Sequence, residues 1–142
     1  MKNGKQLLSG ILRTAQLGQT SIRSVLDTGM APGLRQALES QLREYDAIEL
    51  EAFSIASQRG WELPEVGLSR RVMTDLTARM NLYRSNTDSQ IAAMLIRSNT
   101  GGLIRGLKEL HRFPGSDERV SILSQKLLDC ETANIRKMQS FL

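Results

Sequence analysis

The sequence contains few aromatic residues: Phe, Trp and Tyr together make up 4% of its 142 residues. A β-sandwich or β-barrel relies on aromatic and β-branched side chains for its core, so this composition disfavours a β fold. Only three prolines are present, and each falls between segments of regular apolar spacing. The core must therefore be built from Leu, Ile, Val, Met and Ala, as is typical of packed helices.

The chain has one cysteine, Cys130, and no long apolar run. One cysteine cannot form an internal disulfide, so nothing indicates an oxidising compartment. No stretch approaches the roughly 18 consecutive apolar residues of a membrane span, and the first residues lack the apolar run of a secretory signal. We therefore expect a cytoplasmic protein with no membrane partner. Because Asp129 and Glu131 flank the thiol, we predict that Cys130 is a partly buried packing residue and not a nucleophile.

The net charge of +4 is not concentrated in a basic run. Residues 67–112 hold eight basic and three acidic side chains, whereas residues 34–59 hold three basic and five acidic ones. Two such segments can be complementary within one fold, so we expect no nucleic-acid partner. A length of 142 residues suits a single domain, which we assign to residues 1–142.

Apolar residues repeat at intervals of three and four along most of the chain, which predicts amphipathic helices. The expected helices span residues 4–28, 33–59 and 117–141, with a longer third segment at 69–112. Asn99–Gly102 should bend or break that segment, so residues 101–112 are either a kinked continuation or a separate short helix. Gly18 lies on the apolar stripe of the first helix, where it permits a close approach by a neighbour. Short turns between long helices predict an all-α, antiparallel up-down-up-down four-helix bundle.

Several polar residues interrupt the apolar stripes at one level of this expected bundle. They are Gln16 and Gln19 in the first helix, Gln41 and Glu44 in the second, residues 86–90 with Asp88 in the third, and Glu131 with Asn134 in the fourth. Burying such a group without a partner costs roughly 1–3 kcal/mol. The set can be a hydrogen-bonded network, a water-filled site, a metal site or a contact with another subunit, and the sequence leaves these alternatives open.

Three segments resemble the ferritin-like superfamily: Gln41–Ile48, Gln90–Leu95 followed by Ser98–Gly102, and Glu131–Met138. The nearest similarity is to small ferritin-like four-helix proteins of Gram-positive bacteria, and it runs over nearly the whole chain. The resemblance implies a ferritin-like bundle from a bacterium. It implies no activity, because that nearer group has none that can be carried over.

In the wider superfamily, a di-iron centre uses Glu on two helices and Glu-x-x-His on the other two. Glu131 and Asn134 have this spacing, but Asn stands in place of His, and the one histidine, His111, cannot complete two sites. We therefore predict no intact di-iron site, no resident cofactor and no catalytic residue. If a metal site exists, iron or manganese would be held by Gln41, Glu44, Asp88, Glu131 and Asn134.

The preferred interpretation is a non-catalytic bundle that self-associates as a homodimer or another homo-oligomer. Its basis is the segment 91–110, which carries apolar residues on more than one face. The alternative is a metal-binding or redox ferritin-like protein with an unusual carboxylate and amide site.

Overall fold

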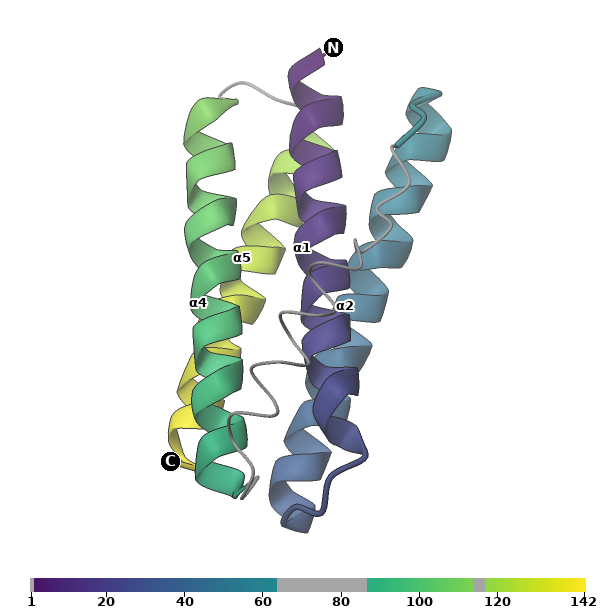
Figure 1. Cartoon of the computed structure of the whole chain (residues 1–142). Coiled ribbons are helices and arrows are strands. Elements are labelled where there is room, and N and C mark those ends of the chain that lie inside the picture. The colour runs from purple at the N-terminus through teal and green to yellow at the C-terminus, as the bar shows by residue number, and fades with distance from the viewer. Residues whose placement is uncertain (1, 64–86, 114–116) are drawn as a thin grey trace.

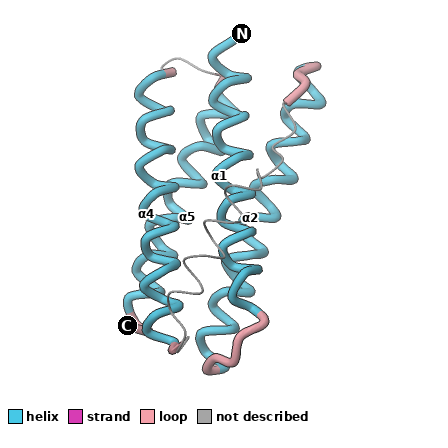
Figure 2. The backbone as a smooth tube through the Cα atoms, viewed as in Figure 1, coloured by secondary structure: helices cyan, strands magenta, loops and turns pink. Residues whose placement is uncertain are grey.

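A computed structural model describes residues 2–63, 87–113 and 117–142. Within these ranges the chain is all-α, with four helices and no strand. The helices pack side by side as a bundle (Figure 1, Figure 2): α1 (Lys2–Leu26), α2 (Pro32–Arg59), α4 (Asp88–Arg112) and α5 (Glu118–Gln139). The predicted helices 4–28, 33–59 and 117–141 correspond to α1, α2 and α5. The predicted all-α bundle is thus confirmed for this part of the chain.

The four helices form two antiparallel pairs, α1 with α2 and α4 with α5 (Figure 1). α1 and α5 each pack against both α2 and α4. At one end of the bundle the starts of α2 and α4 meet, since the Ala31 N–H donates to the Asp88 carboxylate at 3.3 Å. At the other end, Arg59 of α2 pairs at 2.6 Å with Asp117, which precedes α5. α2 and α4 therefore run in the same direction, and the expected alternation of consecutive helices does not hold for these four.

α4 differs from the predicted third helix at its start and in its middle. It begins after Thr87, whose hydroxyl accepts the N–H of Gln90 at 3.2 Å, while the Gln90 side chain accepts the N–H of Thr87 at 3.4 Å. It then runs unbroken through two consecutive glycines to its end, so residues 101–112 are a continuation of the helix and not a separate one. Packing of Gly102 against α1 and α5 offsets the low helix propensity of glycine. Residues 69–86 of the predicted third helix lie outside the described residues.

Local signals set both ends of α2 and the start of α5. α2 starts with Pro32, whose fixed φ suits the first helical position, and ends at Gly60, which has the left-handed φ of 68°. α5 begins after Asp117, whose side chain accepts the Arg119 N–H at 2.9 Å. Between these ends, apolar side chains of all four helices form one core. In the described part, Tyr45 is the single fully buried aromatic residue of that core.

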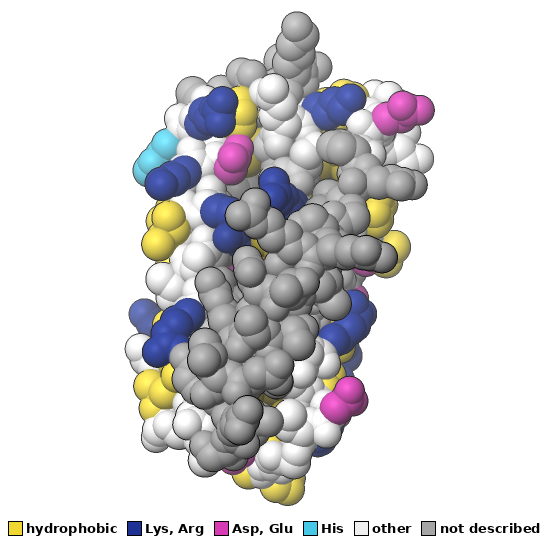
Figure 3. All heavy atoms as spheres, in the orientation of Figure 1, with side chains coloured by type: hydrophobic (Ala, Val, Ile, Leu, Met, Phe, Trp, Pro, Cys, Tyr) yellow, Lys and Arg dark blue, Asp and Glu magenta, His cyan; other side chains and the backbone are white. Residues whose placement is uncertain are grey.

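The surface carries dispersed charges and small apolar patches. On the face drawn in Figure 3, Lys and Arg side chains lie at separate places among the residues that are coloured. Large exposed apolar residues include one pair on α2, Leu50 and Phe53, and one pair on α4, Ile104 and Leu107. Two further ones stand singly, Ile122 on α5 and Leu142 after it. Within the described ranges, no helix has both the length and the apolar character needed to cross a bilayer.

Candidate functional site

Three polar side chains from three helices meet in the interior of the bundle. Tyr45 of α2, Asn99 of α4 and Glu131 of α5 are only 1%, 3% and 2% exposed. The Tyr45 hydroxyl lies 2.6 Å from Glu131 Oε1 and 3.0 Å from Asn99 Oδ1. The shorter distance is typical of an O–H···O bond in which one partner is charged. These three residues, the central cluster, form a hydrogen-bonded group shielded from solvent.

Two glycines make room for the central cluster, one on α1 and one on α4. A Cβ atom on Gly18 would lie 2.5 Å from Tyr45 Cζ, far inside the roughly 3.5 Å of an ordinary carbon contact. A Cβ atom on Gly102 would lie 3.1 Å from Glu131 Oε2 and 3.1 Å from Thr14 Cγ2. The predicted close approach at Gly18 is confirmed, and the approaching group is the Tyr45 ring. All four described helices therefore shape this site.

The surroundings of Glu131 raise the pKa of its carboxyl from the ordinary 4.5 to about 7. Burial is the main cause, because the charged form loses its hydration. The hydrogen bond from Tyr45 and the charge of Arg105 act in the opposite direction, and the carboxylate of Glu44 adds a further increase. Burial and the Glu131 charge also raise the pKa of Tyr45, so its hydroxyl keeps its proton. Near neutral pH, Glu131 is therefore the titrating member of the central cluster.

A second group of polar side chains adjoins the central cluster along α5. The Cys130 thiol donates a hydrogen bond to Glu44 Oε2 at 2.8 Å and accepts one from Asn134 Nδ2 at 3.4 Å. Burial raises the pKa of the Cys130 thiol, and the hydrogen bond to Glu44 raises it further. A thiol held in the protonated form is a poor nucleophile. Cys130 is half-buried, so the prediction of a partly buried residue is confirmed.

Several buried polar atoms lack a hydrogen-bond partner among the described residues. They are Glu131 Oε2, Asn99 Nδ2, Gln16 Oε1 and both polar side-chain atoms of Gln41. Gln41 is 2% exposed and lies one helical turn from Tyr45 on the same face of α2. Each unpaired buried atom costs roughly 1–3 kcal/mol. The polar band predicted from the sequence is therefore buried only in part, at Gln19, Gln41, Glu131 and Asn134, and Glu44 is exposed. Protein groups satisfy the buried polar atoms incompletely.

The structure brings together most, but not all, of the predicted metal-ligating residues. Glu44 and Asn134 both contact Cys130, and Glu131 follows that cysteine directly. Gln41 is buried on α2, and its side chain makes no hydrogen bond to them. Asp88 lies apart, at the end of the bundle where it binds the Ala31 backbone. Its predicted position assumed that the third helix runs antiparallel to α2, whereas α4 starts beside the start of α2.

Tyr45 and Asn99 are missing from the predicted site, although both belong to the central cluster. Tyr45 lies on the apolar stripe of α2, where a buried phenol needs a hydrogen-bond partner. Asn99 lies four residues after Leu95, on the buried face of α4. A polar group at a buried position of a helix indicates from the sequence that a hydrogen-bond partner is needed. The packing of the helices is required to identify that partner.

The described residues do not fit a di-iron centre. Among them Glu131 is the one buried carboxylate, and His111 is exposed in the last turn of α4. In the same part of the chain, no three His, Cys, Asp or Glu side chains are grouped so that they could hold a metal ion. A di-iron centre needs carboxylates from four helices and two histidines, and the interior described above offers a phenol and amides in their place.

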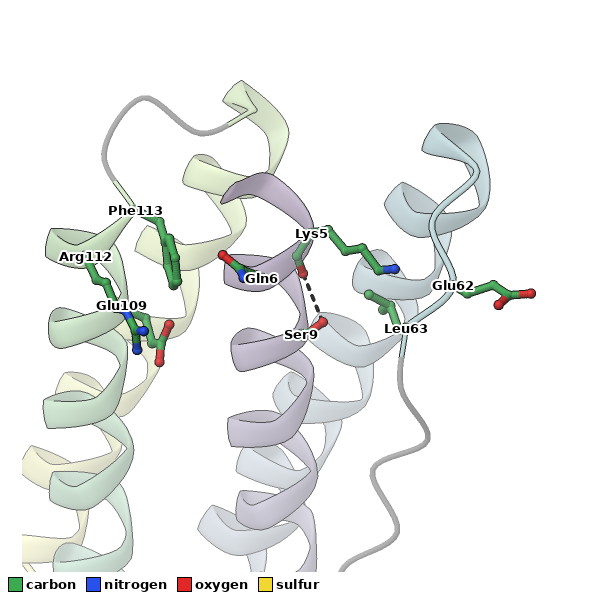
Figure 4. A pocket seen from close by; sticks show the side chains of 8 residues that line it. All are labelled: Lys5, Gln6, Ser9, Glu62, Leu63, Glu109, Arg112 and Phe113. Atoms are coloured by element: carbon green, nitrogen blue, oxygen red, sulfur yellow. Dashed lines mark hydrogen bonds between the residues drawn. The ribbon is translucent and has the colours of Figure 1, made fainter. Parts of the chain in front are cut away.

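A cavity of about 720 Å³ lies at the end of the bundle where α1 starts (Figure 4). Figure 4 shows Gln6 extending from α1 on the side of α4, and Lys5 extending from α1 on the side of residues 61–63. The lining combines two cations, two anions and two apolar side chains: Lys5, Gln6, Ser9, Glu62, Leu63, Glu109, Arg112 and Phe113. Because opposite charges are interleaved in it, the cavity has no clear preference for a ligand of one sign.

Comparison with known proteins gives no match to the chain, whether with protein-family models, curated proteins or solved structures.

Proposed function

We propose that this protein is a non-catalytic, ferritin-like helical bundle that self-associates in the cytoplasm. The observation that carries the first part is the 2.6 Å hydrogen bond between Tyr45 and Glu131 in the interior of the bundle. Ferritin-like di-iron proteins build their metal sites in the bundle core from side chains on facing helices. In this chain the Tyr45 ring, packed against Gly18, lies in the core, and its hydroxyl is bonded to the one buried carboxylate of the described residues.

The connectivity of the helices supports the ferritin-like part of the proposal. The chain forms one antiparallel pair, leaves α2 at one end of the bundle, and enters α4 at the other end. Ferritin-like bundles are likewise two helix pairs with one long crossover connection between them. The free thiol of Cys130 agrees with a reducing compartment such as the cytoplasm.

Metal analysis tests the non-catalytic part. The untagged protein would be produced with added iron and manganese, and bound metal would be measured by plasma mass spectrometry. We expect less than one metal ion per chain, with no change on Glu131→Ala or on the control Glu39→Ala, an exposed carboxylate of α2. Stoichiometric metal that is lost in Glu131→Ala and kept in Glu39→Ala would contradict the proposal. It would favour the alternative, a metal-binding or redox site that includes Glu44 and Asn134.

Self-association is supported by the exposed apolar pair on α4. Ile104 and Leu107 are 49% and 40% exposed, and their spacing of three residues places them on one side of the helix. Exposed apolar side chains that lie together are typical of protein contacts. The α2 pair Leu50 and Phe53 is exposed too, but the segment 91–110 of α4 carries apolar residues on more than one face, so the proposed dimer contact includes this side of α4.

Light scattering coupled to size exclusion tests the contact. We expect a dimer mass for the wild type and a monomer mass for the double variant Ile104→Glu, Leu107→Glu. The matched control is Leu50→Glu, Phe53→Glu on α2, which should remain dimeric. A monomeric wild type at tens of micromolar would contradict self-association, and dissociation of the α2 control alone would contradict the assignment to α4.

A further inference from the structure

The Tyr45 hydroxyl has one hydrogen atom and two acceptors. It lies 2.6 Å from Glu131 Oε1 and 3.0 Å from Asn99 Oδ1, and all three groups are buried. A phenol can donate only one hydrogen bond, although its oxygen can also accept. One of the two contacts must therefore have its hydrogen on the partner and not on Tyr45.

A proton on Glu131 satisfies both contacts at once. The Glu131 O–H then donates to the Tyr45 oxygen, and the Tyr45 O–H donates to Asn99 Oδ1. Without that proton, Tyr45 must donate to the Glu131 carboxylate, and Asn99 Oδ1 then faces an oxygen that has no hydrogen left for it. The contact is restored if the Asn99 amide turns over and Nδ2 donates to Tyr45. Asn99 Nδ2 has no other partner among the described residues, so this turn breaks no bond in that part of the chain.

We propose that Glu131 is a buried proton-binding site, and that binding or loss of its proton reverses the hydrogen bond to Tyr45 and turns over the Asn99 amide. The proton neutralises the buried carboxylate. The two hydrogen-bond arrangements rest on the short distances that join the Tyr45 hydroxyl to Glu131 and Asn99.

Charged groups on the surrounding helices set the range in which Glu131 titrates. α2 presents the Glu44 carboxylate, which disfavours a second negative charge, and α4 presents Arg105, which favours it. α5 contributes the neutral Cys130 thiol. α1 contributes Thr14, next to Gly102, while the charge of Arg13 acts on Arg105. With burial as the largest effect, the pKa of Glu131 is about 7, so the two arrangements exchange around neutral pH.

Nuclear magnetic resonance of the full chain tests the proposal in two parts. First, the side-chain carboxyl carbon of Glu131, assigned by its loss in Glu131→Gln, would be followed against pH. We expect the midpoint of this titration near pH 7, which corresponds to a proton affinity more than roughly tenfold higher than that of an ordinary glutamate. A midpoint in the ordinary range would overturn the proton-binding site.

Second, the side-chain amide signals of Asn99 report the reversal. In the wild type they should change with the same midpoint as Glu131, and in Glu131→Gln they should not change over that range. In Tyr45→Phe, Glu131 should still titrate, at a higher midpoint because a bond to its charged form is lost, while Asn99 no longer follows it. The coupling would be overturned if the Asn99 signals in the wild type did not change with the Glu131 midpoint. It would also be overturned if they changed with the Glu131 midpoint in Tyr45→Phe as they do in the wild type.

The outcome is separable from that of the proposed function. Stoichiometric bound metal would contradict the proposed function, whereas an ordinary Glu131 midpoint in metal-free protein would contradict the inference made here. If Glu131→Gln failed to fold, the comparison of wild type with Tyr45→Phe would still decide whether Asn99 follows Glu131 through the phenol.

Discussion

Replacing Gly18 with alanine tests how closely α1 is fitted to the Tyr45 ring. The added Cβ would lie 2.5, 2.6 and 2.8 Å from three ring carbons, where roughly 3.5 Å is the ordinary contact distance. The ring cannot retreat easily, because Tyr45 is 1% exposed and its hydroxyl is bonded to Glu131. Something must therefore move: either α1 separates from α2, or the hydrogen bond is broken.

The magnitude follows from two opposing effects. Overpacking a core costs about 1–3 kcal/mol, and disturbing the buried hydrogen bond adds roughly 1–3 kcal/mol. The higher helix propensity of alanine offsets about 1 kcal/mol of this destabilisation. We expect Gly18→Ala to lower the free energy of unfolding by roughly 2–4 kcal/mol.

Gly10 provides a matched control on the same helix. There a Cβ atom would lie 3.6 Å from Glu109 Cγ, an ordinary contact, so Gly10→Ala should stabilise the protein by about 0.5–1 kcal/mol. Urea unfolding followed by circular dichroism measures both variants, at one protein concentration because self-association would shift the transition. The two alanines should change stability in opposite directions.

A third variant identifies the ring as the cause. In a Tyr45→Leu background the aromatic carbons next to Gly18 are absent, so Gly18→Ala should cost much less than it does in the wild type. The reasoning is refuted if Gly18→Ala is as stable as Gly10→Ala. It is equally refuted if the cost of Gly18→Ala is the same with and without the Tyr45 ring.

Three further predictions concern acidity, reactivity and capping. Because the pKa of Glu131 rises on folding to about 7, the folded state binds the proton more tightly than the unfolded chain, and the free energy of unfolding of the wild type, relative to that of Glu131→Gln, should fall by about 3 kcal/mol from pH 4 to pH 8. Urea unfolding across this range should show the loss mainly between about pH 4.5 and about pH 7, and a difference that stays constant with pH would contradict the prediction. In the folded protein at neutral pH, Cys130 should react with iodoacetamide at less than roughly one tenth of its rate in the urea-unfolded chain. Glu44→Gln should speed the reaction, since the Glu44 hydrogen bond and charge raise the thiol pKa; equal rates in folded and unfolded protein would contradict the prediction. Thr87→Ala should lower the free energy of unfolding by about 1 kcal/mol, because it removes the acceptor for the Gln90 N–H. Hydrogen exchange should become faster in the first turn of α4, and unchanged exchange there would show that the cap does not hold that turn.

Much of the helical content could be predicted from the sequence, because the apolar spacing is regular and the ends of α2 and the start of α5 carry strong local signals. Pro32 and Gly60 bracket α2, and the apolar spacing between them is regular. α4 was harder to predict, since two consecutive glycines usually indicate a break. The helix continues there because Gly102 packs against Glu131, a contact between distant parts of the chain that no local rule contains. The start of α4 did carry a local signal, the spacing of Thr87 and Gln90.

The candidate site was predictable in outline only. Counting residues along expected helices placed Glu44, Glu131 and Asn134 at one level, and the structure places them around Cys130. The same count placed Asp88 with them, because it depended on the direction of a helix that spacing alone cannot fix. Which side chain fills the space between the helices depends on how closely they approach, and at Gly18 the Tyr45 ring lies where a Cβ atom would not fit.

The direction of the helices has a consequence for the electric field of the bundle. Among the four described helices, each end of the bundle combines two N-termini with two C-termini, so the macrodipoles of neighbouring helices oppose one another and largely cancel. The N-termini of α2 and α4 nevertheless meet directly, and two positive partial charges lie side by side there. Ala31, the residue before α2, has no side chain that could cap it. The carboxylate of Asp88 accepts the Ala31 N–H from the neighbouring helix, so one negative charge compensates the positive ends of two helices.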